Sequence, residues 1–152
     1  YATIYLSPKD YHRVHSPVDA QVLSYDYVPG TLWPVNRWAT ERREGLLARN
    51  ERVVIRMNAG ALGDVALVMV GAAGVGNIRL SHAPDSATFR GLRERRRIEL
   101  SGVTVKKGDE LGAFRLGSTV VMVFAPGKVT LRGEVGHPVR FGERIGSGGG
   151  AP

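Results

Sequence analysis

Hydrophobic and polar residues alternate with a period of two along most of the chain. The alternating segments are rich in Val, Ile, Thr and Tyr and are separated by Gly, Pro, Asn and Asp, which is typical of strands joined by tight turns. Strands are predicted over residues 1–7, 20–28, 52–57, 64–70, 76–81, 97–105, 119–124 and 128–135. Many short strands with regularly spaced turns favour a mainly β fold, as a flattened barrel or sandwich.

Helices are expected to be few, so the fold is α+β at most. One or two short helices are predicted, and the one convincing helical segment covers residues 42–49. A weak internal echo relates residues 16–35 to residues 125–146, because each has a small residue before Pro, a strand, a Gly turn and a returning segment. Two such half-motifs build the flattened barrels of lipoyl and biotinyl carriers. We predict one domain over residues 1–145, followed by a flexible tail over 146–152, where Gly and Ser dominate.

Composition and charge narrow the classes of function. The chain has 152 residues, of which 43% are hydrophobic and 23% charged, as in an ordinary globular domain. It has no Cys, which excludes disulfides, Cys-based zinc sites and thiol chemistry. The net charge of +7 favours an anionic partner. The longest apolar run, residues 65–76, is shorter than the roughly 20 residues of a membrane-spanning helix.

Positive charge is concentrated in residues 89–100. Five arginines lie among the eight positions 90–97. Two interpretations remain open, a solvated loop and a surface that contacts phosphate groups. Aromatic residues are scarce in this segment, and the spacings of a helix-turn-helix or a zinc finger are absent. A nucleic-acid partner is therefore supported by charge alone.

Two short motifs carry side chains suited to catalysis. Asp10, His12 and His15 lie within six residues, and two imidazoles beside a carboxylate suit proton transfer near neutral pH. A structural role for the pair of His remains open, and no metal site is expected because no third ligand is nearby. Downstream, Ser118 is a hydroxyl nucleophile that directly follows the carbonyl of Gly117. Taken alone, this Gly-Ser turn is a common feature.

Taken together, the two motifs resemble those of the bacterial phosphatidylserine decarboxylases. The resemblance is carried by residues 5–17 and 106–129, with residues 28–36 and 46–54 between them in the same order. It covers nearly the whole chain apart from the Arg-rich segment and the tail. In that family an Asp that completes the catalytic triad, and the membrane-docking helices, come before the region matched here. We therefore expect this chain to lack the family's N-terminal region.

The resemblance implies a cofactor made from the chain itself. Family members cut themselves between the Gly and the Ser of the motif, here Gly117 and Ser118, which gives a β chain ending at residue 117 and an α chain over residues 118–152. Ser118 becomes a covalent pyruvoyl group, which forms a Schiff base with phosphatidylserine and withdraws electrons as CO₂ leaves, to give phosphatidylethanolamine. The resemblance makes His15 the base that activates Ser118, and it implicates His12 in decarboxylation.

The same resemblance implies the partners and the location. The expected partners are phosphatidylserine, an anionic membrane surface and the β and α chains of one precursor, at the cytoplasmic face of the cell membrane. No nucleic acid is expected, and a homodimer is left open. The alternative is a non-catalytic lipoyl-like carrier module, in which Gly117 and Ser118 form only a turn. Its exposed attachment residue would have to be Lys106 or Lys107.

Overall fold

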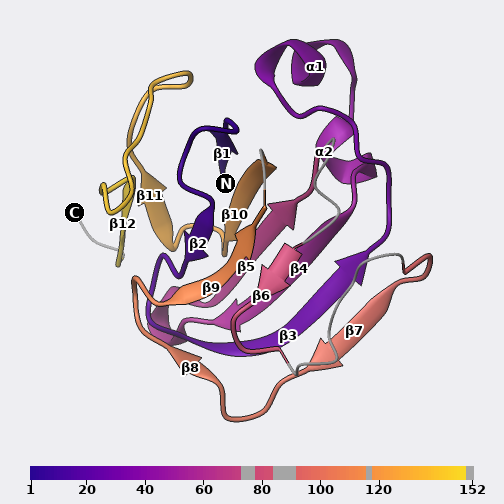
Figure 1. Cartoon of the computed structure of the whole chain (residues 1–152). Helices are drawn as coiled ribbons and strands as arrows, with labels where there is room; N and C mark the ends of the chain where they lie inside the picture. The colour runs from indigo at the N-terminus through magenta and orange to yellow at the C-terminus, as the bar shows by residue number, and fades with distance from the viewer. Residues whose placement is uncertain (73–77, 84–91, 116–117, 150–152) are drawn as a thin grey trace.

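The structure is a computed structural model that describes residues 1–72, 78–83, 92–115 and 118–149. The described strands form antiparallel sheets of seven, three and two strands (Figure 1). The mainly β class predicted from the alternating pattern is confirmed. The sheets form a flattened sandwich and do not close into a barrel.

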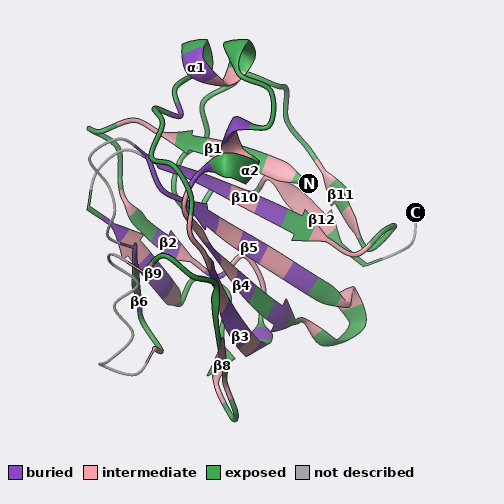
Figure 2. Cartoon of the chain, turned by 90° about the vertical axis from the view of Figure 1, so that its right-hand side faces the viewer, coloured by how far each residue is buried: buried purple, intermediate pink, exposed green. Residues whose placement is uncertain are grey.

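The seven-stranded sheet contributes most of the buried hydrophobic residues in the described part of the chain. Its strand order is β1–β10–β5–β4–β3–β7, and β8 also pairs with β3. The strands are β1 (Ala2–Leu6), β3 (Ala20–Val28), β4 (Arg52–Asn58), β5 (Asp64–Val70), β7 (Arg96–Glu99), β8 (Thr104–Val105) and β10 (Ser118–Phe124). Buried and more exposed residues alternate along the central strands, as a two-residue period requires (Figure 2).

A three-stranded sheet packs against one face of the large sheet. It consists of β2 (Arg13–His15), β9 (Glu110–Phe114) and β6 (Ile78–Leu80) in the order β2–β9–β6. The small sheet contributes Val14, Leu80, Leu111 and Phe114 to one core, and the large sheet contributes Val22, Tyr25, Ile55, Leu67 and Met122 among others. Burying each of the aliphatic side chains contributes roughly 1.5–3 kcal/mol, so this shared core holds the two sheets together.

The two short helices, α1 (Arg37–Arg42) and α2 (Leu46–Arg49), confirm the expectation of one or two. Their bounds differ from the segment predicted over residues 42–49, and a 3₁₀ turn, η1 (Gly60–Leu62), follows β4. Gly45 adopts a left-handed conformation with φ of 66° and separates α1 from α2. The two helices share a small second core of Val35, Ala39, Leu46 and Ala72.

Three further predictions of local structure are corrected. The strand predicted over residues 97–105 is two strands, β7 and β8, because Gly102 turns the chain with φ of 74°. The strand predicted over 128–135 is shorter, because β11 (Val129–Leu131) ends before Gly133, whose φ is 112°. The first residues of the predicted flexible tail form β12 (Gly146–Gly148), which pairs with β11.

The two segments of the internal echo also differ in structure. Residues 16–35 contain the nine-residue strand β3, whereas residues 125–146 contain the three-residue strand β11 and end at the first residue of β12. None of the helices among the described residues has the length and apolar character needed to cross a membrane.

Candidate active site at the start of strand β10

Ser118 is the first residue of β10 and lies inside the protein. It is opposite Leu6 of β1, and its side chain shares the inward face of β10 with Val120 and Met122. Its exposed fraction is 0%, and its Oγ has no hydrogen-bond partner among the described residues. Leaving a buried hydroxyl unpaired costs about 1–3 kcal/mol, so such groups in native proteins are rare and often functional. Gly117, the other predicted cleavage-site residue, lies outside the described residues.

A tight turn at Ser7–Asp10 leads the chain from β1 towards His12. The amide N–H of Ser7 donates to Asp10 Oδ2 at 2.7 Å, and the amide N–H of Asp10 donates to the Ser7 carbonyl at 2.9 Å. The hydrogen bond from Ser7 is the main reason why the pKa of the Asp10 carboxyl is lowered. Asp10 therefore has the turn-forming role that its residue type favours, and its carboxylate does not orient a His ring.

His12 is held so that one ring nitrogen is free and basic. Its Nδ1 lies 2.5 Å from the carbonyl oxygen of Asp10. Because a carbonyl only accepts, Nδ1 must carry the proton and donate it, which leaves Nε2 unprotonated in the neutral ring. That Nε2 is buried and has no hydrogen-bond partner among the described residues. His12 thus has the tautomer and the unpaired lone pair that a general base requires.

His15 has the same tautomer, but both of its ring nitrogens are engaged. Nδ1 donates to the carbonyl of Gly108 at 2.7 Å, and Nε2 accepts from the Tyr11 hydroxyl at 2.9 Å. The ring also stacks on Tyr11, with 5.7 Å between centroids, and packs against Phe141, with 4.6 Å between centroids. A backbone carbonyl therefore orients this imidazole, and a tyrosine hydroxyl occupies its basic nitrogen.

Buried polar atoms without a partner among the described residues occur just after β1, just before β2 and at the start of β10. Of the buried side-chain N and O atoms without a partner in the described residues, four belong to Ser7, His12, Ser118 and Thr119. Ser7 follows the residue that pairs with Ser118, and the His12 carbonyl accepts from the amide N–H of Phe114, the last residue of β9. The segment that leads from Ser7 to His12 is thus linked to β10 through the pairing of β1 and to the end of β9 through His12, although Ser118 Oγ bonds to neither histidine.

No motif in the sequence identifies several of the residues that surround the candidate site. Gly108 and Phe141 acquire their roles through contacts with His15, which is distant from both in the sequence. Tyr11 lies inside the His motif, and its position there is the single signal that could have identified it. Glu110, opposite His15, forms an ion pair with Arg13 at 2.6 Å and is also 3.6 Å from Arg79.

The geometry of the described residues does not support metal binding or the function of a lipoyl-like carrier. Among the described residues, no cluster of His, Asp or Glu has the arrangement of a metal site. The carrier alternative relies on Lys106 and Lys107, but Lys106 pairs with Asp19 at 3.4 Å and the amide of Lys107 donates to the same carboxylate at 2.7 Å. Asp19 thus ties this turn to the body of the protein.

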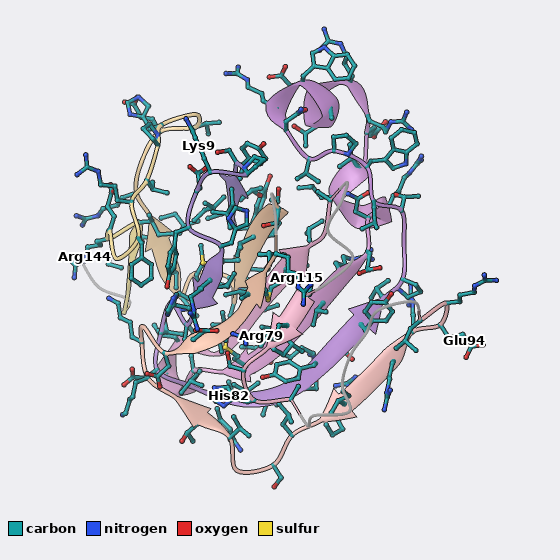
Figure 3. All side chains as sticks on the ribbon, viewed as in Figure 1. Lys9, Arg79, His82, Glu94, Arg115 and Arg144 are labelled. Atoms are coloured by element: carbon teal, nitrogen blue, oxygen red, sulfur yellow. The ribbon has the colours of Figure 1, made fainter. Side chains whose placement is uncertain are left out.

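The described part of the Arg-rich segment includes β7, which lies at the edge of the large sheet opposite to β1. Arg96 and Arg97 belong to β7, and together with Arg95 they line an open cavity of about 410 Å³ with Asp26, Tyr27 and Val28. Arg97 is neutralised by Asp26 at 3.3 Å and Glu99 at 2.5 Å. In Figure 3, Glu94 just before β7 lies on the opposite side of the molecule from Lys9, which is on the loop after β1. The strands β5, β4 and β3 lie between β10, which begins with Ser118, and β7, so the cavity is remote from Ser118.

Comparison with known proteins gives one consistent result. The sequence profile of the family described as phosphatidylserine decarboxylase matches residues 1–147. The chain is 45% identical to the phosphatidylserine decarboxylase proenzyme of Anaeromyxobacter sp. (strain K) over 150 residues, which cover 96% of this chain and 53% of the relative. It is 43% identical to the proenzyme of Nitrosospira multiformis over 152 residues, covering 95% and 52%. The chain spans about half the length of these curated relatives.

Proposed function

The chain belongs to the phosphatidylserine decarboxylase family, and from this premise we propose that the protein removes the carboxyl group of phosphatidylserine to give phosphatidylethanolamine. Like the relatives named as proenzymes, it would be made as a precursor. The proposed cut lies between Gly117 and Ser118 and yields fragments 1–117 and 118–152.

The buried, unpaired hydroxyl of Ser118 is the observation that carries this proposal. In the proposed cut, Ser118 Oγ attacks the carbonyl carbon of Gly117, and the amide becomes an ester as the nitrogen takes up a proton. Elimination then removes the Cα proton of residue 118 to a base and breaks its Cβ–Oγ bond, which leaves a Cα=Cβ double bond on residue 118 and a carboxylate on Gly117. Water replaces the nitrogen of residue 118, ammonia departs, and a pyruvoyl group remains. A hydroxyl already engaged by another side chain would be less free to start this reaction.

The residues present suit a cofactor of this kind, because Ser118 supplies its atoms and no separate cofactor motif is needed. The pyruvoyl group supplies an electron sink for the loss of CO₂. His12 would move the proton of the decarboxylation step through Nε2, which is basic and unpaired among the described residues. His15 would take the proton of Ser118 after the Tyr11 hydroxyl has turned away from its Nε2.

The proposed partners follow from the substrate and the charge. A phospholipid substrate resides in a membrane, and a net charge of +7 favours a membrane with anionic lipids. We propose that the protein is peripheral to the cytoplasmic face of the cell membrane, and that fragments 1–117 and 118–152 stay together, because β10 pairs with both β1 and β5.

Intact-mass spectrometry of the full-length gene product tests the proposal. We expect a cut before residue 118, with a smaller fragment whose first residue lacks an amino group. Ser118→Ala should remain uncut and have no detectable decarboxylase activity. Thr119→Val is the matched control, because Thr119 is a similarly buried, unpaired hydroxyl that points to the opposite face of β10, and it should still be cut. Decarboxylation of phosphatidylserine by an uncut protein would disprove the mechanism.

A further inference from the structure

Both tryptophans of the sequence lie exposed on one protrusion. We define this Trp protrusion as residues 32–49, which include α1 and α2. Trp33 is 43% exposed, Trp38 is 65% exposed, and neighbouring Leu32 is 37% exposed. Figure 2 shows that most of α1 is exposed as well. Large apolar rings are normally buried, so their concentration at one surface indicates an interaction site.

Arginines cover the faces of both rings. The guanidinium of Arg43 lies 3.8 Å from the ring centroid of Trp33, and that of Arg42 lies 4.7 Å from the ring centroid of Trp38. Tryptophan prefers the boundary between lipid headgroups and acyl chains, while arginine binds the phosphates there. The Trp protrusion contains four Arg against two Glu, so it carries a net positive charge. Its charge therefore complements an anionic lipid surface.

The Trp protrusion is fixed to the large sheet at the end where Ser118 lies. Asn50 donates to the carbonyls of Trp33 at 2.8 Å and Gly71 at 2.9 Å, and it accepts from the amide N–H of Trp33 at 3.1 Å. Gly71 directly follows β5, whose last residue, Val70, is opposite Thr119. Figure 1 shows α1 and α2 beyond this end of β5. A surface that the Trp protrusion contacts would thus lie on the Ser118 side of the sheet.

We propose that the Trp protrusion docks the protein onto a bilayer that contains anionic phospholipids. Trp33 and Trp38 enter the interface, and Arg42 and Arg43 contact the lipid phosphates. The inference rests on the proposed function, because it explains how the end of the sheet that carries Ser118 is turned towards a substrate held in a membrane. Within residues 1–152, it assigns membrane contact to the Trp protrusion rather than to the arginines of β7, in addition to the N-terminal docking helices that the family resemblance implies.

Tryptophan fluorescence reports on this surface when the emission is compared with that of Trp33→Phe with Trp38→Phe, because the difference between the two spectra comes from Trp33 and Trp38. The probes are vesicles of phosphatidylcholine with or without phosphatidylglycerol, which is anionic but not a substrate. With phosphatidylglycerol, we expect the emission to shift to the blue and to be quenched by brominated acyl chains, and high salt should weaken both effects. Unchanged emission from protein that sediments with the vesicles would overturn the proposal.

Two variants that remove the same charge at different places distinguish binding through the Trp protrusion from binding through net charge alone. Arg42→Gln with Arg43→Gln should weaken binding to the anionic vesicles roughly 30-fold at low salt, because each arginine contributes about 1 kcal/mol. Arg95→Gln with Arg96→Gln removes the same charge at the β7 edge and should have a much smaller effect. Equal losses in both variants would show that net charge alone drives binding, and so would overturn the proposal.

The outcomes also distinguish this inference from the proposed function. If Ser118 is never cut but the Trp emission shifts on vesicles, the proposed chemistry fails and the docking stands. If dispersed short-chain phosphatidylserine is decarboxylated but the Trp residues never reach the bilayer, the docking fails alone. If Trp33→Ala with Trp38→Ala changes the sedimentation mass and leaves vesicle binding intact, the Trp protrusion joins two copies of the chain and the proposal is wrong.

Discussion

Asn50 and Ser118 are both fully buried polar residues, yet their surroundings are opposite. Asn50 uses its whole side-chain amide: it donates to the carbonyls of Trp33 and Gly71 and accepts from the amide of Trp33 and the hydroxyl of Thr31. Ser118 Oγ has no partner within the region of the chain that the structure describes. Both residues are 0% exposed. Burial alone therefore does not distinguish a residue that builds the fold from one that is available for chemistry, whereas hydrogen bonding does.

The two histidines repeat this contrast. A backbone carbonyl fixes Nδ1 in each ring, so Nε2 is the basic atom in both. In His15 that atom is occupied by the hydroxyl of Tyr11, whereas in His12 no described residue occupies it. Under the proposed function, His12 is ready to exchange a proton, while His15 must first lose its partner.

The largest expected effect is on stability and tests the role of Asn50. Asn50→Leu, made in the uncut Ser118→Ala background, should lower the free energy of unfolding by roughly 3–5 kcal/mol, because it leaves several buried backbone and hydroxyl groups unpaired. Urea unfolding at pH 7 measures the change. Thr119→Val in the same background removes an unpaired hydroxyl and keeps the shape, so it should cost nothing or stabilise slightly. A similar loss of unfolding free energy in both variants would mean that hydrogen-bonded and unpaired buried side chains contribute equally to stability, contrary to this prediction.

A second prediction uses the contrast between the histidines. His12→Gln should lower the turnover of phosphatidylserine by at least about 100-fold, because it removes the unpaired base, while the precursor is still cut. His15→Gln should instead slow the cutting itself. The measurements are turnover by protein already cut and the rate at which precursor disappears. Slow cutting in His12→Gln, with normal turnover afterwards, would assign the histidines the other way round.

The sequence predicts the strands better than it predicts the site. Alternation alone identifies β3 and β5 to the residue, because each is a central strand with one face in the core. It misses α1, whose N-terminus is capped by Asn36 through a 2.9 Å bond to the amide of Ala39. It also misses β12, a Gly-rich segment that is ordered by pairing with β11. These elements depend on a local cap or on a distant partner, which a two-residue period does not report.

The sequence proposes the residue types of the candidate site but not their environment. The Gly-Ser turn alone is a common feature, and the roles of Ser118, His12 and His15 are proposed from the family resemblance of the two motifs taken together. That Ser118 is buried depends on pairing with Leu6, which is distant in the sequence. The side chain of Asn50, unlike that of Ser118, is fully hydrogen-bonded because it contacts Trp33 and Gly71. No spacing in the sequence predicts these contacts.

The smallest expected effect is a change in stability at Glu110, whose carboxylate is paired with Arg13 but partly exposed to solvent. A hydrogen bond from Arg13 is the main cause of the lowered pKa of the Glu110 carboxyl, with further contributions from Ser81 and Arg79. A lowered pKa means that the ionised form stabilises the folded state, so this contribution is present above the ordinary value of 4.5 and is lost as the pH falls through the folded pKa. Glu110→Gln should therefore cost about 0.5–1 kcal/mol at pH 7, and the difference from the parent should shrink in acid. Urea unfolding from pH 7 into acid measures the difference in unfolding free energy between the parent and the variant. A difference that does not change with pH would mean that Glu110 stabilises the fold through packing and not through its ion pair.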